Sequence, residues 1–127
     1  MEEREIRKIF EDAGAVITDS HIVYTSGEHG SAYINKDGLY PDTRRIKRLC
    51  DEMAYRFANH GTCDLLADIV IAPAIGGVIL SQWIAHELTD LLSQPVLSAY
   101  AEKDGDSFII KRGYDALVRG KRVFVVE

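Results

Sequence analysis

The sequence contains few of the residues and segments that mark specialised protein classes. It has only two cysteines, Cys50 and Cys63, and their separation does not match the spacing of metal ligands. Cys50 falls on the apolar face of a predicted helix, so we expect a buried thiol there. No apolar run approaches the roughly 20 residues of a membrane span, and the acidic first residues do not resemble a secretory signal. These features favour a protein of the reducing cytoplasm without a membrane-spanning segment.

The charge balance is acidic overall and basic in one stretch. Twenty acidic and 15 basic residues give a net charge of −5, which argues against non-specific binding of nucleic acid. Between residues 103 and 122 cations outnumber acids, so this stretch suits either a small anion or a solvated, charge-rich loop. The cations are Lys103, Lys111, Arg112, Arg119, Lys121 and Arg122, and the acids are Asp104, Asp106 and Asp115.

The N-terminal third predicts a helix followed by an antiparallel hairpin. Residues 2–13 have apolar residues at helical spacing, and Gly14 is a suitable stop. Short strands are expected at 15–17, 22–24 and 32–35, with a turn over 26–30. His29 lies in this predicted turn, where no partner residue marks it as a general base, so we expect it to be solvated.

From Asp42 onward, helices and strands alternate. Asp42 is a good N-cap for a helix that reaches about Asn59, and the apolar run 68–72 is typical of a central parallel strand. A break over 73–77, a helix over 78–92 and strands over 96–100, 107–110 and 123–126 follow. This alternation predicts an α/β fold, with a central parallel sheet flanked by helices. Within one structural domain we distinguish residues 1–40, the N-terminal helix and hairpin, and residues 41–127, a partial core.

The segment Ala74-Ile75-Gly76-Gly77 joins the predicted central strand to a helix. Glycines allow backbone N–H groups to approach an anion, and the helix N-terminus adds a partial positive charge. The segment is neither a Walker loop nor a full dinucleotide-binding fingerprint. It predicts either a phosphate-type site or a tight structural turn.

Four segments together resemble the orotate phosphoribosyltransferases, and their order holds across the chain. Residues 26–36, Ser-Gly-Glu-His-Gly-Ser-Ala-Tyr-Ile-Asn-Lys, are similar to that family's hood segment. Residues 72–78 resemble its pyrophosphate loop, and residues 100–103 lead into the position of its catalytic arm. Residues 120–127, Gly-Lys-Arg-Val-Phe-Val-Val-Glu, resemble the strand that opens its phosphoribosyl pyrophosphate (PRPP) signature.

The resemblance implies a type I phosphoribosyltransferase fold with a small N-terminal hood. It also implies transfer of the phosphoribosyl group of PRPP to orotate in pyrimidine biosynthesis, with Mg²⁺ bound mainly through PRPP and a homodimer that shares its active sites. Lys103 would be the catalytic cation on the arm. The remaining residues that it implies are Ala74, Ile75, Gly76, Gly77 and Glu127 for PRPP, and Tyr33, Ile34 and Lys36 for the base.

Some features depart from the family pattern. The arm lacks the Lys-x-x-Lys-x-His run of many members, and Lys111 or Arg112 could substitute. Gly76 stands where a lysine is often found. The residues that would cradle the 5′-phosphate lie beyond Glu127, so we expect the C-terminal part to be missing and this fragment alone to be inactive. Other base specificities, or a non-catalytic nucleotide- or partner-binding module, remain as alternatives.

Overall fold

The computed structural model describes residues 1–60 and 67–127, and it divides into two compact units. The first unit is Met1–Ile46 and the second is Lys47–Glu127, whereas the sequence placed the boundary at residue 40. Cys63 lies outside the described residues. None of the helices in the described ranges has the length and apolar character needed to cross a membrane.

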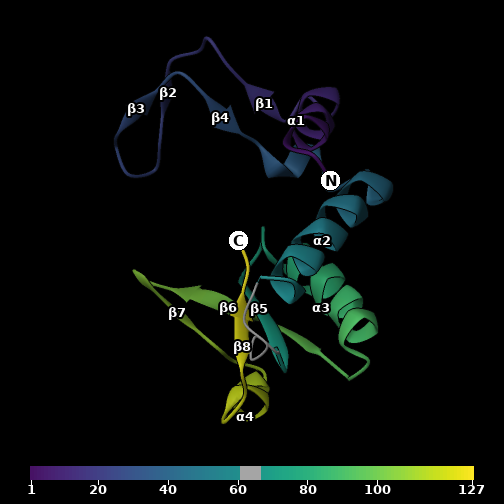
Figure 1. The fold of residues 1–127 in the computed structure, drawn as a ribbon. Coiled ribbons are helices and arrows are strands. Elements are labelled where there is room, and N and C mark those ends of the chain that lie inside the picture. The colour runs from purple at the N-terminus through teal and green to yellow at the C-terminus, as the bar shows by residue number, and fades with distance from the viewer. Residues whose placement is uncertain (61–66) are drawn as a thin grey trace. The chain divides into compact units, whose positions relative to one another are not determined.

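The first unit begins with helix α1, Glu3–Asp12, as predicted (Figure 1). Its N-terminus is closed by a capping box: the Glu2 side chain accepts from the Glu5 backbone N–H, and the Glu5 side chain accepts from the Glu2 backbone N–H. Ile9 is buried, and Gly14 ends the helical segment with a φ of 63°, a conformation that glycine adopts without steric cost.

The predicted hairpin is present, but its strands pair in a nested order. Strand β1, Val16–Ile17, pairs with β4, Tyr33–Ile34, while β2, Ile22–Val23, pairs with β3, His29–Gly30. The prediction of a turn over all of residues 26–30 is therefore wrong at its end, because His29 and Gly30 belong to a strand. The chain reverses between Tyr24 and Glu28, whose backbone groups bond at 2.9 Å.

A short 3₁₀-helix, η1 (Lys36–Gly38), follows the hairpin, with the Asn35 side chain accepting from the Asp37 N–H. Helix α2 then spans Thr43–Ala58, close to its predicted limits. The predicted cap is confirmed, since one carboxylate oxygen of Asp42 accepts from the N–H groups of Arg44 and Arg45, both at 3.1 Å.

The second unit is built on a four-stranded sheet with the order β7-β6-β5-β8 (Figure 1). The strands are β5 (Ile69–Pro73), β6 (Leu97–Asp104), β7 (Ser107–Ile109) and β8 (Val123–Val125). Strand β5 runs parallel to both of its neighbours, and β7 is antiparallel to β6. The central parallel strand is confirmed, and β6 is longer than predicted because it continues into the hairpin with β7.

Helices cover the sheet unequally. On one face, α3 (Val78–Leu92) bonds to β6 through Ser81 and Ser98, and Phe57 of α2 stacks on Phe124 of β8 at 3.9 Å. On the other face, Ile69, Ile71 and Ala99 pack against Ile110 and against α4 (Tyr114–Val118). Helix α4 was not predicted, since five residues are too few to give a periodic pattern. Val123 and Val125 remain 41% and 66% exposed at this face of β8.

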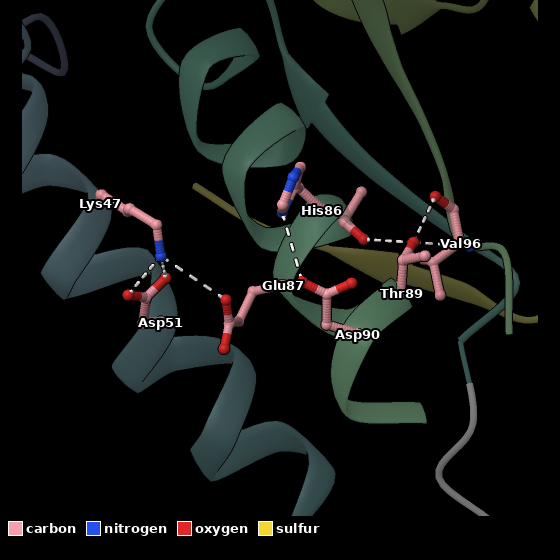
Figure 2. Close-up of polar contacts among 8 residues, drawn as sticks. Lys47, Asp51, His86, Glu87, Thr89, Asp90 and Val96 are labelled. Carbon is pink, nitrogen blue, oxygen red and sulfur yellow. Dashed lines mark hydrogen bonds and ion pairs between the residues drawn. The ribbon is translucent and has the colours of Figure 1, made fainter. Parts of the chain in front are cut away.

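Polar contacts fasten α2 and α3 within the second unit (Figure 2). The Lys47 ammonium bonds to Asp51 at 2.7 Å and lies 3.6 Å from Glu87 of α3, and the bond to Asp51 raises the pKa of Lys47. Two residues after Glu87 in α3, the Thr89 hydroxyl donates to the Ala85 carbonyl and accepts from the Val96 N–H. Thr89 thereby fixes the connection into β6.

Cys50 is fully buried in α2, which confirms the predicted buried thiol. Burial raises its pKa to about 12, because the thiolate would lose its hydration. The side chain is therefore a protonated packing group and not a nucleophile at neutral pH.

Asp68 and Arg122 clamp the start of the sheet. The Asp68 carboxylate accepts from the Arg122 side chain at 2.7 and 3.0 Å and from its backbone N–H at 2.8 Å. The Asp68 backbone bonds to Arg122 on one side and to Leu97 on the other. The Arg122 guanidinium and N–H hold the pKa of Asp68 well below its ordinary value. One residue thus sets the register of the three parallel strands at their amino ends.

Asp68→Asn should destabilise the chain at pH 7, and the loss should depend on pH. The folded-state pKa of Asp68 lies below its unfolded value of about 4, so its contribution is present above that pH and fades as the pH falls further. Urea unfolding at pH 7 and at pH 3 would measure this. The control is Asp106→Asn, in an exposed turn. Equal pH dependence for both variants would contradict the clamp.

Gly77 is required where β5 turns into α3. A Cβ there would lie 2.6 Å from the Ala72 Cβ and 2.9 Å from the Pro73 carbonyl oxygen, whereas a Cβ on Gly76 meets nothing within 4 Å. We expect Gly77→Ala to cost about 1–3 kcal/mol of unfolding free energy, as overpacking does. Gly76→Ala, the matched control, should leave the urea midpoint unchanged or slightly raised. Equal midpoints would show that the turn tolerates a side chain.

Candidate functional site

The carboxyl edge of the parallel sheet brings together three of the predicted segments. Because β5, β6 and β8 run in the same direction, the segments that follow them leave the sheet at one edge. The loop 74–77 follows β5, Lys103 lies near the end of β6, and Glu127 follows β8. In the sheet register Pro73 pairs with Ala101 and Ile71 with Val125. Residues far apart in the sequence therefore share one edge.

The loop after β5 uses most of its amides internally. The Ala74 N–H donates to the Ala101 carbonyl of β6 at 2.7 Å, and the Gly77 N–H donates to the Pro73 carbonyl at 3.0 Å. The Val78 N–H donates to the Ile75 carbonyl, and the peptide bond between Ala74 and Ile75 is cis. Ile75 is 88% exposed. Within the described residues, the Ile75 N–H donates no hydrogen bond, so it is the loop amide best placed to meet an anion.

Lys103 extends from the hairpin that β6 and β7 form beyond the sheet. It pairs with Phe108 in this hairpin, and Gly105 makes the turn with a φ of 61°. Glu102 and Lys103 are neighbours on one strand, so their side chains point to opposite faces of the hairpin. The Glu102 carboxylate accepts from Arg112 at 2.6 Å and lies 4.0 Å from Lys111. Lys103 therefore faces away from this ion-paired group.

Ion pairs neutralise half of the basic stretch that the sequence revealed. Lys111 and Arg112 face Glu102, the bond to Glu102 raises the pKa of Arg112, and Arg122 binds Asp68. Among the described residues, Lys103, Arg119 and Lys121 form no ion pair. Arg119 and Lys121 precede β8, at the amino end of the sheet. Within the part of the chain that the structure describes, Lys103 is thus the cation of this stretch that lies at the carboxyl edge without an ion pair.

The residues predicted for the base belong to the first unit. Tyr33 and Ile34 form β4 and are 46% and 55% exposed, and Lys36 begins η1. The exposure of Tyr33 and Ile34 leaves these two side chains available to a binding partner. Their role, like that of the residues at the sheet edge, stays a prediction.

The sequence missed one close contact between chemically active side chains. His29 was expected to be solvated without a partner, but its Nδ1 lies 2.7 Å from the Nε2 of His21. His21 precedes strand β2 and His29 lies in β3 opposite Val23, so the contact depends on a strand register that the sequence pattern did not give. A second group, His86, Glu87 and Asp90, has donor atoms within 4.8 Å of one another on α3 (Figure 2). Lys47 already faces Glu87, so this group is explained as surface ion pairs.

Comparisons with known proteins agree with this architecture. No family model matches the chain. The chain is 28% identical over 127 residues to the orotate phosphoribosyltransferase of Parvibaculum lavamentivorans and 32% identical over 127 residues to that of Desulforamulus reducens. Each match covers 100% of this chain and 60% of the relative. The chain therefore spans about three fifths of the length of these curated relatives.

A solved structure shares the fold. The crystal structure of the Francisella tularensis orotate phosphoribosyltransferase matches 97% of this chain and 55% of that protein, with a TM-score of 0.63 and 19% identity. The α/β fold of the type I phosphoribosyltransferases, with a parallel sheet flanked by helices, is thereby confirmed. The resemblance inferred from the motifs is confirmed as well, since this chain is similar along its whole length to curated orotate phosphoribosyltransferases.

Proposed function

We propose that the protein represented by this chain transfers the phosphoribosyl group of PRPP to orotate, giving orotidine 5′-monophosphate and pyrophosphate. The observation that carries this proposal is the meeting of the loop 74–77, Lys103 and Glu127 at one edge of the sheet, in a chain similar along its length to orotate phosphoribosyltransferases. In parallel α/β sheets this edge is where ligands bind.

The reaction breaks the bond between the ribose anomeric carbon and the pyrophosphate oxygen, and the electron pair leaves with pyrophosphate. A nitrogen of the base forms the new bond to that carbon, and the proton that this nitrogen carried is released to water. The transition state carries oxocarbenium character, as in glycoside cleavage, so stabilising the departing negative charge lowers the barrier. Lys103 would neutralise that charge from the β6–β7 hairpin, and the Ile75 N–H would donate to a phosphate oxygen.

A magnesium ion fits this arrangement if it arrives mainly with PRPP. Mg²⁺ in phosphate chemistry usually binds substrate phosphates, waters and one or two carboxylates. Glu127 is exposed after β8 and has the oxygen donors that Mg²⁺ requires, while Glu102 is already paired with cations. When bound, Mg²⁺ would supply further neutralisation of the pyrophosphate charge. The base would contact Tyr33, Ile34 and Lys36. The whole protein would be a cytoplasmic homodimer.

The assay for this proposal is consumption of orotate in the presence of PRPP and Mg²⁺, with hypoxanthine and adenine as competing bases. It should follow an intact-mass measurement on the purified protein, because the chain spans only 60% of its relatives. Turnover of a purine base instead of orotate would overturn the base assignment. PRPP binding without turnover of any base would favour a non-catalytic module.

Lys103→Ala should lower kcat by about 10²–10³-fold, the usual cost of losing one electrostatic contact to developing charge. Lys121→Ala is the matched control, since Lys121 is also exposed and outside any ion pair of the described residues, but precedes β8. Its kcat should stay within about twofold of the unsubstituted protein. Equal rates for both variants would remove Lys103 from the mechanism.

A further inference from the structure

The outer hairpin of the first unit holds two imidazoles in direct contact. The Nε2 of His21 lies 2.7 Å from the Nδ1 of His29, and the ring centroids are 4.8 Å apart. A nitrogen–nitrogen hydrogen bond requires one ring to donate and the other to accept. At least one ring therefore directs an unprotonated lone pair toward the nitrogen of the other.

The strand pairing places these two side chains on the same face. His29 pairs with Val23 across the β2–β3 ladder, and His21 is two residues before Val23. Side chains two apart on a strand share a face, so His21 and His29 are diagonal neighbours within side-chain reach. The contact follows from the backbone register and does not depend on one side-chain rotamer alone.

The surrounding hairpin is held by several further contacts. The Tyr24 hydroxyl donates to the Ala32 carbonyl at 2.6 Å and so bridges the two arms. Gly30 lies directly under the Tyr24 ring, where a Cβ would collide with the phenol. The Ser20 N–H donates to the Ser31 carbonyl at 3.4 Å. These contacts fix the two backbone segments that carry the histidines.

The histidines also line a surface hollow with a volume of about 400 Å³. The other lining residues are Asp19, Ser20, Gly30 and Ser31. Imidazole nitrogen is a preferred donor for Zn²⁺, Ni²⁺ and Cu²⁺, and a carboxylate can complete such a set. Asp19 also lines the hollow, but the proposed ligands are the two imidazoles, and the open side admits water molecules as the remaining ligands.

We propose that His21 and His29 together bind a divalent transition-metal ion, such as Zn²⁺ or Ni²⁺, through His21 Nε2 and His29 Nδ1. The ion takes the place of the hydrogen that the two nitrogens share. Two metal–nitrogen bonds of about 2.0–2.1 Å at a tetrahedral angle place the nitrogens about 3.3 Å apart. Both side chains are exposed, so the two nitrogens can move apart from 2.7 Å by the roughly 0.6 Å that this requires.

Calorimetric titration of the 127-residue chain with NiCl₂ and with ZnCl₂ tests the proposal. We expect one ion per chain, and His21→Gln and His29→Gln should each weaken binding by at least about tenfold, since losing even an outer-shell partner of a metal site costs about 10- to 100-fold. His86→Gln is the matched control, because His86 lies beside two carboxylates on α3. It should bind as the unsubstituted chain does.

Unchanged binding in both hairpin variants, or loss of binding in the His86 variant, would overturn the proposal. A second measurement needs no substitution. Ni²⁺ is paramagnetic, so in proton spectra of the unsubstituted chain it should broaden the ring signals of His21 and His29 before those of His60 and His86. Broadening that begins at His86 would place the ion on α3 and would also overturn the proposal. Neither measurement involves orotate or PRPP, so the result is independent of the proposed activity.

Discussion

The parallel pairing of β5 with a strand on each side is the constraint on which the second unit depends. Ile69, Val70 and Ala72 are completely buried, so the backbone groups of this strand must bond to neighbouring strands and not to water. Asp68 fixes the amino end of the arrangement by binding Arg122, and Gly77 fixes the carboxyl end by allowing the chain to turn closely into α3. The candidate site lies at the edge that this pairing creates.

Ion pairing decides which charges remain available at that edge. The sequence shows a run of cations, but Glu102 and Asp68 neutralise three of them. Glu102 does not pair with Lys103, because neighbouring side chains along β6 point to opposite faces of the strand. Among the described residues, Lys103 has no ion pair that would have to break before it could meet an anion. The positive charge available at this edge therefore depends on which cations form ion pairs as well as on which cations are present.

The first unit follows a different principle, since its strands are only two residues long and pair in a nested hairpin. Little apolar burial holds the outer part, where Val23 is 60% exposed. Its order comes instead from the Tyr24 hydroxyl, the close approach at Gly30 and the contact between two histidines. Short polar contacts of this kind do not produce a periodic sequence pattern.

Elements with strong periodicity or clear end signals were predictable, as the buried run at β5, the Asp42 cap of α2 and the glycine turn before α3 show. Helix α4 was missed because its five residues depend on packing against Ile69 and Ile71. The partners of His29 and Glu102 were missed because strand register and side-chain alternation decide them.

By itself, the sequence determined the α/β class and the segments that could carry phosphate chemistry, because local propensity and hydrophobic pattern reside in neighbouring residues. Only the tertiary structure decided that these segments share one edge and that Lys103 has no ion pair among the described residues, because both facts depend on contacts between residues distant in the chain.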